Sequence, residues 1–226
     1  MLSSLFQDFS DIIVFDVETT GTDPAKDEII EIAMLRITGG QGVPKIEEEY
    51  DAFVKLSPGR KLPPIITDIT GITGQQLMDE GLAKDVVCEK LVEMLSRENL
   101  LLSAYNAQFD LGFLFHFLSG FNKAGLLRKA KMLDALTIYR DRRPYPHKLG
   151  DAAAAYLLTT QNSHRAYADT KVTFELLCAM GKESDDLVRY VNLFGYNPKY
   201  GVSGSKISSV RYLPQGYDRA RKLYEA

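Results

Sequence analysis

The sequence lacks several features that mark specialised classes of protein. Among its 226 residues there is no tryptophan, and there are only two cysteines, Cys88 and Cys178. Two cysteines so far apart exclude a small disulfide scaffold, and we interpret both as buried apolar side chains. No apolar run approaches the roughly 20 residues that a membrane helix needs. The first residues also lack the basic flank of a secretory signal, so we expect a cytoplasmic protein with no membrane partner.

The chain also lacks a strong excess of charge of either sign. It carries 27 lysines and arginines against 30 aspartates and glutamates, a formal net charge of -3. Apolar residues make up 45% of the sequence, which is enough to fill a core and excludes a disordered acidic chain. By charge alone, nucleic acid would rank low among the partners of this protein.

Three strands are predicted near the start of the chain. Residues 11–18 are rich in β-branched side chains, which is typical of a buried strand. Apolar residues alternate in 28–37 and again in 47–56, and the glycine-rich stretch 39–42 separates the two. Short turns between successive strands favour an antiparallel meander.

The spacing of the apolar residues then changes from that of a strand to that of a helix. Helices are expected over 84–97, 110–118, 149–158 and 165–180, with short buried strands at 100–104 and 131–133. A meander followed by alternating strands and helices predicts an α/β fold, with a mixed five-stranded sheet flanked by helices.

The composition changes after residue 180. Residues 181–226 hold six of the twelve tyrosines, and eight lysines or arginines against five aspartates or glutamates. We therefore divide the chain into a domain at 1–180 and a tyrosine-rich, locally basic appendage at 181–226. Two functions of the appendage stay open. It could stack on a single nucleic-acid strand, or it could cover the surface of its own domain.

The chemical signal is a set of acidic residues at positions where apolar residues are expected. Asp16 and Glu18 lie two apart at the end of the first strand, so both point to the same face. Two such carboxylates repel each other unless a cation neutralises them. The alternative is a solvent-facing strand end or an aspartate that caps a turn.

Two further aspartates lie on the apolar stripes of predicted helices. Asp110 shares a face with Leu114 and Phe117, and Asp169 begins a stripe that continues through Thr173 and Leu176. A first-turn aspartate that complements the helix dipole is the alternative interpretation of each.

The combination of these residues indicates a metal site more strongly than any one of them. A sheet with helices on its faces can bring one strand end and two helix starts to one edge. Four carboxylates suit Mg²⁺ or Mn²⁺, and two such ions about 4 Å apart can activate water against a phosphodiester. His164, five residues before Asp169, offers an imidazole that exchanges protons near neutral pH.

Three motifs make the sequence resemble the DEDDh (DnaQ-like) 3′-to-5′ exonucleases. The motifs are Phe15-Asp16-Val17-Glu18-Thr19-Thr20-Gly21, Asn106-Ala107-Gln108-Phe109-Asp110 and His164-Arg165-Ala166-Tyr167-Ala168-Asp169. Within this family the chain looks most like the exonuclease domains of bacterial DNA polymerase III, of the epsilon or PolC type. The resemblance covers about residues 11–180 and implies an RNase H-like fold.

The resemblance also implies a role for each matching residue. Asp16, Glu18, Asp110 and Asp169 would hold two divalent metal ions, and His164 would be the general base. Thr19, Thr20, Ile72 and Asn106 would bind substrate, with Thr19 and Ile72 contacting the terminal nucleotide. The spacing between His164 and Asp169 fits the histidine class, because the sister class has a tyrosine where this chain has Arg165. The family often has histidine at the position of Tyr105. We expect this difference to affect substrate preference more than activity.

The function expected from the sequence is therefore that of a 3′-to-5′ exonuclease. Its substrate would be a single-stranded or frayed 3′ end, most naturally of DNA, and its product would be nucleoside monophosphates. A DNA polymerase is a candidate partner, with proofreading or repair as the process. An exoribonuclease of the oligoribonuclease or RNase T type, and a non-catalytic module that binds nucleic acid or a polymerase, remain as alternatives.

Overall fold

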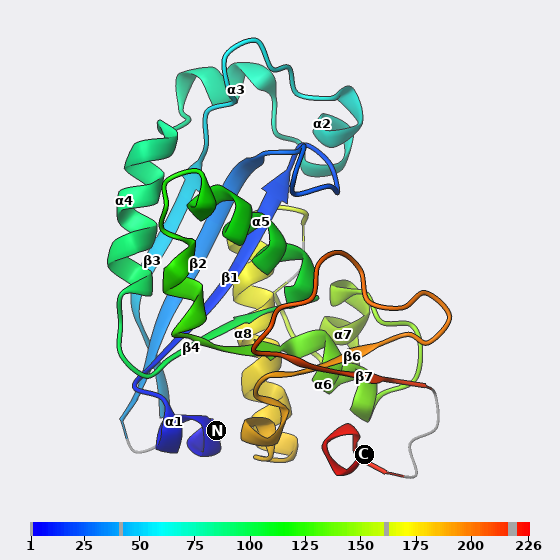
Figure 1. Ribbon diagram of the computed structural model, residues 1–226. Helices are drawn as coiled ribbons and strands as arrows, with labels where there is room; N and C mark the ends of the chain where they lie inside the picture. The colour runs from blue at the N-terminus through cyan, green and yellow to red at the C-terminus, as the bar shows by residue number, and fades with distance from the viewer. Residues whose placement is uncertain (1, 41–42, 161–162, 217–220) are drawn as a thin grey trace.

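The computed structural model describes residues 2–40, 43–160, 163–216 and 221–226. Its centre is a five-stranded sheet in the order β3-β2-β1-β4-β5 (Figure 1). The strands are β1 Asp11–Thr19, β2 Ile29–Gly40, β3 Val43–Phe53, β4 Leu100–Ala104 and β5 Lys131–Asp134. β1, β2 and β3 pair antiparallel, whereas β4 lies parallel to β1 and β5 parallel to β4. The predicted mixed sheet, with its meander and its parallel strands, is confirmed.

β1 supplies apolar side chains to both faces of the sheet. Ile13, Phe15 and Val17 belong to one apolar cluster, and Ile12 and Val14 belong to another. This alternation is the two-residue period of a strand. The even-numbered positions that continue the second face beyond Val14 are occupied by carboxylates instead of apolar side chains.

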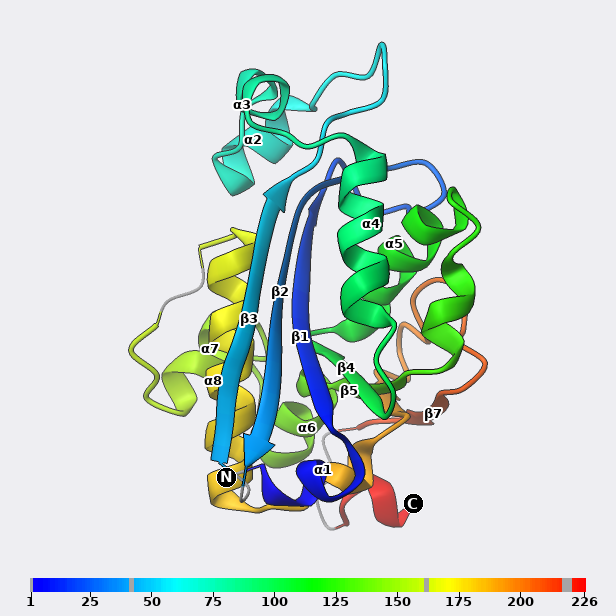
Figure 2. The same ribbon diagram turned by 90° about the vertical axis from the view of Figure 1, so that its left-hand side faces the viewer.

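Helices cover the two faces of the sheet (Figure 2). On one face lie α4 Lys84–Leu95 and α5 Ala107–Ser119. The other face carries α6 Ala135–Arg142, α7 Leu149–Ala155 and α8 Ala166–Glu183. The core therefore has two layers of apolar side chains, one on either side of the sheet.

Shorter elements complete the domain. They are α1 Ser3–Asp8, α2 Pro64–Thr70, α3 Gly74–Asp79 and the 3₁₀ helix η1 Ala124–Arg128. α2 and α3 form a small lobe beyond one end of the sheet, at the top of Figure 1. That lobe has its own apolar cluster around Ile30, Ile72 and Leu77.

Most of the predicted elements occur, with shifted ends. The third strand runs from Val43 to Phe53, earlier than expected, and the long last helix extends to Glu183. Gly39 and Gly40 still belong to β2, and the remainder of the predicted turn, residues 41–42, lies outside the described residues. α6 was not expected, and neither were the two short helices α2 and α3.

Residues beyond 180 pack into the same two clusters as the rest of the chain. They form η2 Leu187–Tyr190, the parallel pair β6 Leu193–Tyr196 and β7 Arg211–Pro214, and η3 Leu223–Glu225. Leu187, Tyr190 and Leu193 are buried on the α8 side, whereas Phe194 and Val210 join the cluster on the α5 side. The apolar part of the appendage therefore covers the surface of its own domain.

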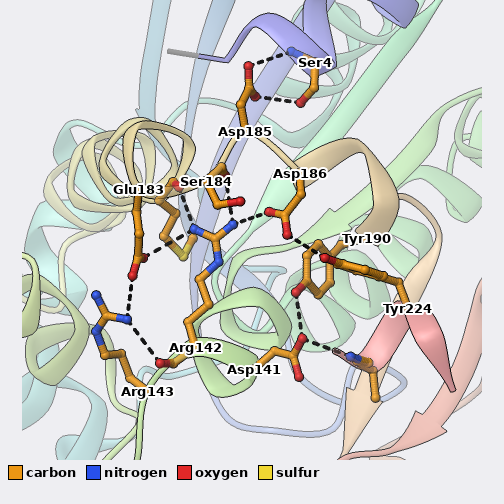
Figure 3. A network of polar contacts seen from close by, with 12 residues as sticks. Ser4, Asp141, Arg142, Arg143, Glu183, Ser184, Asp185, Asp186, Tyr190 and Tyr224 are labelled. Atoms are coloured by element: carbon orange, nitrogen blue, oxygen red, sulfur yellow. Dashed lines mark hydrogen bonds and ion pairs between the residues drawn. The ribbon is translucent and has the colours of Figure 1, made fainter. Parts of the chain in front are cut away.

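A polar network ties this segment to α6 and α8 (Figure 3). The guanidinium of Arg142, 2% exposed, donates to the Met180 and Ser184 carbonyls and pairs with Asp186. Beside it, Asp141 accepts hydrogen bonds from the Tyr190 hydroxyl at 2.7 Å and from the Leu223 N–H at 2.9 Å. A buried arginine requires such partners, because an unpaired buried charge is costly.

In the described parts of the chain, no helix is long and apolar enough to cross a membrane.

Candidate active site

Three carboxylates meet where β1 passes the first turn of α8. Asp16 and Glu18 lie on the face of β1 that α8 covers, and Asp169 lies in the first turn of that helix. One oxygen from each of the three lies within 4.8 Å of the others. The sheet therefore brings together residues that are more than 150 positions apart in the sequence, as the sequence predicted.

The fourth predicted carboxylate, Asp110, approaches from α5 on the other side of β1. It is buried, and its Oδ1 accepts a hydrogen bond from the Val17 N–H at 3.2 Å. Its charge also acts on Asp16, the residue before Val17. Asp110 thus lies beside Asp16, although it is not a member of the three-oxygen cluster.

The electrostatics of the cluster call for a cation. Burial, together with the negative charges of Asp110, Glu18 and Asp169, raises the pKa of Asp16 well above its usual range. Burial raises the pKa of Glu18 to about 8, with further contributions from Asp169 and Glu31. The pKa values of Asp110 and Asp169 are raised too, mainly by burial. Crowded carboxylates of this kind are ionised readily only beside positive charge, and their hard oxygens fit a divalent ion such as Mg²⁺ or Mn²⁺.

His164 lies at the entrance to α8. It is exposed, and its backbone has a φ of 52°, in the left-handed region that histidine adopts more often than most residues do. The neighbouring Ser163 N–H donates to Asp169 Oδ1 at 2.9 Å. This contact fixes the segment that carries His164 against the carboxylate cluster.

A cavity of about 590 Å³ joins these residues. Its lining includes Asp16 and Asp169 from the cluster, together with His164 and, from the start of α5, Asn106. Tyr105, Leu136, Arg140 and the segment His147–Asp151 line the rest of it. A polar cavity that holds acidic residues with raised pKa values is the expected place for catalysis.

Of the predicted substrate residues, Asn106 lines this cavity, whereas Thr19, Thr20 and Ile72 do not. The hydroxyl groups of Thr19 and Thr20 are engaged within the turn after β1. Thr19 Oγ1 donates to the Gly21 carbonyl at 2.6 Å, and Thr20 Oγ1 accepts from the Glu28 N–H at 2.9 Å. Ile72 is fully buried in the α2–α3 lobe. A contact between Ile72 and a nucleotide would therefore require that lobe to repack.

Two charged residues that hold the start of α8 against the sheet were not given a role from the sequence. Glu31 lies directly opposite Glu18 in the β1–β2 pairing, and it is only 1% exposed. Arg165, just before α8, binds the Glu31 carboxylate, which also accepts the Ala166 N–H at 2.9 Å. The pair fastens the start of α8 to the sheet. Its sequence signal was a glutamate inside an apolar strand.

Asp134 is a third residue that was not given a role from the sequence. Buried at the end of β5, it accepts the N–H groups of Asn106 and Ala107 at 3.0 and 3.1 Å. It also accepts the N–H groups of Leu136 and Thr137, and the Thr137 hydroxyl at 2.6 Å. One carboxylate thereby holds the starts of α5 and α6 together, and it supports the left-handed backbone of Asn106, whose φ is 66°.

Comparison with known proteins gives matches of two kinds. A family model described as Exonuclease (RNase_T) matches residues 13–177. The DNA polymerase III PolC-type of Bacillus subtilis (strain 168) is 34% identical over 176 residues, which cover 76% of this chain and 11% of that protein. The PolC-type polymerase of Caldanaerobacter subterraneus subsp. tengcongensis is 30% identical over 223 residues, 95% of this chain and 15% of that protein. The chain thus spans only a small part of these relatives.

Solved structures match as well. The zinc-bound complex of E. coli exonuclease I with single-stranded DNA has a TM-score of 0.71 and 21% identity, covering 80% of this chain and 42% of that one. Exonuclease I from Methylocaldum szegediense has a TM-score of 0.69 and 22% identity, with 80% and 42% covered. These matches confirm the predicted RNase H-like fold.

Proposed function

The chain belongs to the exonuclease family that its residues 13–177 match, and from this premise we propose that it is a metal-dependent 3′-to-5′ exonuclease. It would hydrolyse the last phosphodiester bond of a nucleic-acid strand and release nucleoside monophosphates. The observation that carries the proposal is the cluster of Asp16, Glu18 and Asp169, with three oxygens within 4.8 Å of one another. Two of the three, Asp16 and Asp169, line a cavity that His164 also lines.

The roles follow the positions of the side chains. Asp16, Glu18 and Asp169 would hold one divalent ion, and Asp16 with Asp110 would hold a second. When bound, ions of this type lower the pKa of water and neutralise charge on the leaving oxygen. His164, which lines the same cavity as Asp16 and Asp169, would accept the proton of the attacking water, because histidine is the side chain that most often serves as a general base. Asn106, at the rim of the cavity, would bind the terminal nucleotide.

DNA is the substrate that we favour. The relatives with the stated identities are DNA polymerases, and exonuclease I has been solved with single-stranded DNA. We propose a single-stranded or frayed 3′ end as the form of the substrate, in keeping with the single-stranded DNA bound to exonuclease I. We further propose a DNA polymerase as partner, with proofreading as the process and repair as the alternative.

A nuclease assay on matched DNA and RNA oligonucleotides tests the proposal. Each strand carries a 5′ label, and the reaction is run with Mg²⁺, with Mn²⁺ and with a chelator. We expect stepwise shortening from the 3′ end with either metal, faster on DNA, and none with the chelator. Faster hydrolysis of RNA would support the exoribonuclease alternative instead.

The matched variants are Asp16→Asn and Asp79→Asn. Asp79 is an exposed aspartate of α3 outside the cavity, so its variant keeps full activity. Asp16→Asn should abolish hydrolysis, and undiminished turnover by this variant would refute the assignment. Strand binding without release of mononucleotides by the wild-type protein would favour the non-catalytic module.

A further inference from the structure

The cavity lined by Asp16 and Asp169 is also lined by two basic residues. Arg140 comes from the last turn of α6, and Lys148 precedes the first residue of α7. We propose that Arg140 and Lys148 form a phosphate-binding subsite, which takes a backbone phosphate of the substrate strand next to the bond that is cut. This inference rests on the proposed nuclease function and adds the residues that hold the strand.

Both cations are free to bind an anion. Within the described ranges, neither Arg140 nor Lys148 forms an ion pair, whereas the next two arginines of the same segment do. Arg142 pairs with Asp186 and Glu183, and Arg143 pairs with Glu183. Arginine and lysine side chains without a carboxylate partner are the groups that commonly bind phosphate in proteins.

The carboxylates near these two cations accept hydrogen bonds from other groups. Asp151 lines the same cavity, and its Oδ2 accepts the backbone N–H of Lys148 at 2.8 Å. Asp134, on which Arg140 acts electrostatically, is occupied by five hydrogen bonds from other groups. Arg140 and Lys148 thus place two positive charges in the lining of the cavity, and neither of these nearby carboxylates forms an ion pair with them.

The backbone around the subsite is fixed before any strand binds. The Tyr105 hydroxyl donates to the His147 carbonyl at 2.8 Å, and His147 Nε2 lies 3.0 Å from the Arg143 carbonyl. These contacts anchor the residue just before Lys148. Arg140 lies on a helix whose first turn is capped by Asp134. With the backbone already placed, binding costs only the conformational entropy of the two side chains.

Tyr105 therefore has a place in this subsite as a positioning residue. It occupies the position at which the family often has histidine, and its hydroxyl holds the segment that carries Lys148. Burial raises the pKa of Tyr105, so its hydroxyl keeps its proton and remains a hydrogen-bond donor.

Steady-state kinetics on a labelled single-stranded DNA with Mg²⁺ test the subsite. We expect the double variant Arg140→Gln/Lys148→Gln to raise KM about tenfold while kcat stays within about twofold. The slope of log KM against log salt concentration should decrease by about 0.7 for each lost phosphate contact. Arg140→Lys keeps the charge and should keep the slope. Lys182→Gln, an exposed lysine in the last turn of α8, is the matched control and should behave as wild type.

An unchanged KM and salt slope in a folded, active double variant would overturn the subsite while leaving the nuclease function intact. If the wild-type protein hydrolyses nothing, the proposed function fails and the subsite is judged by fluorescence anisotropy of the same DNA with Mg²⁺. Weaker binding by the double variant would then support the subsite, and equal binding would overturn it. Thermal unfolding of each variant shows that the comparison is made between folded proteins.

Discussion

The guanidinium of Arg165 binds the buried carboxylate of Glu31 through two nitrogens, across 134 positions of sequence. Nη2 donates to Oε1 at 2.8 Å, and Nε lies 3.1 and 3.2 Å from the two carboxylate oxygens. The Glu31 side chain is 1% exposed and the Arg165 side chain is 39% exposed. The two residues therefore differ in what their loss would cost. Without Arg165, the carboxylate of Glu31 would stay buried with neither water nor a cation beside it.

The first prediction concerns this pair. Arg165→Met should lower the free energy of unfolding by about 3 kcal/mol, at the low end for a buried pair because Arg165 is partly exposed. The double variant Glu31→Gln/Arg165→Met should recover part of the loss, since no unpaired charge remains. Urea unfolding measures both changes. Lys171→Met, which breaks an exposed pair with Glu49 at 3.9 Å, is the control and should cost less than about 1 kcal/mol.

The second prediction concerns His164. Asparagine tolerates the left-handed backbone found there, so His164→Asn removes the imidazole without straining the chain. We expect kcat to fall by about 10²–10⁴ with little change in thermal stability. His116→Asn, an exposed histidine of α5, should keep normal kcat. Equal kcat for both variants would remove His164 from the catalytic set.

The third prediction concerns pH and metal. In the metal-free protein, burial raises the pKa of Glu18 from 4.5 to about 8. Between these two values the unfolded chain releases a proton that the folded chain retains, so the stability falls as the pH rises. The stabilisation is complete below pH 4.5 and is lost as the pH passes through about 8. A divalent ion favours the ionised carboxylates, and we therefore expect it to raise Tm more at pH 8 than at pH 5.

Scanning calorimetry at the two pH values, with chelator and with Mg²⁺, measures this effect. Glu18→Gln should weaken the pH dependence of Tm in the metal-free protein, because the titrating group is gone. A metal-induced rise in Tm of equal size at both pH values would contradict the prediction.

The fourth prediction concerns the segment beyond residue 180. Leu187 is fully buried in the cluster that α8 also enters. Leu187→Ala should therefore destabilise the whole protein by about 2–5 kcal/mol, in a single unfolding transition. Lys199→Ala, an exposed change in the same segment, should have no comparable effect. A separate, early transition for Leu187→Ala would instead support the division at residue 180 that the composition suggests.

The sequence predicted those parts of the fold whose pattern is local. β1 and β4 were found because they are short apolar runs, and α8 because its stripe repeats over 18 residues. α6 was missed because its last three residues, Arg140 to Arg142, are all charged. Two of them are buried, and the network of Figure 3 satisfies them from α8 and η2, which no local pattern reveals.

Within the candidate site, too, the sequence indicated only the residues that interrupt a local pattern. Asp16, Glu18, Asp110 and Asp169 were identified because each interrupts an apolar face. Ile72 was expected at the substrate and is buried, because an apolar residue in a motif gives no sign of whether its side chain faces a ligand or the core. Arg140 and Lys148 were given no role from the sequence, since only the fold shows that they line the same cavity as Asp16 and Asp169.

Asp134 has a consequence for the tolerance of this chain to mutation. All five of its hydrogen-bond partners are donors, four backbone N–H groups and one hydroxyl. An asparagine there would be the same size, but its amide NH₂ would face hydrogens where an oxygen is required. Among side chains of this size, only a carboxylate therefore has an acceptor for all five donors at this position.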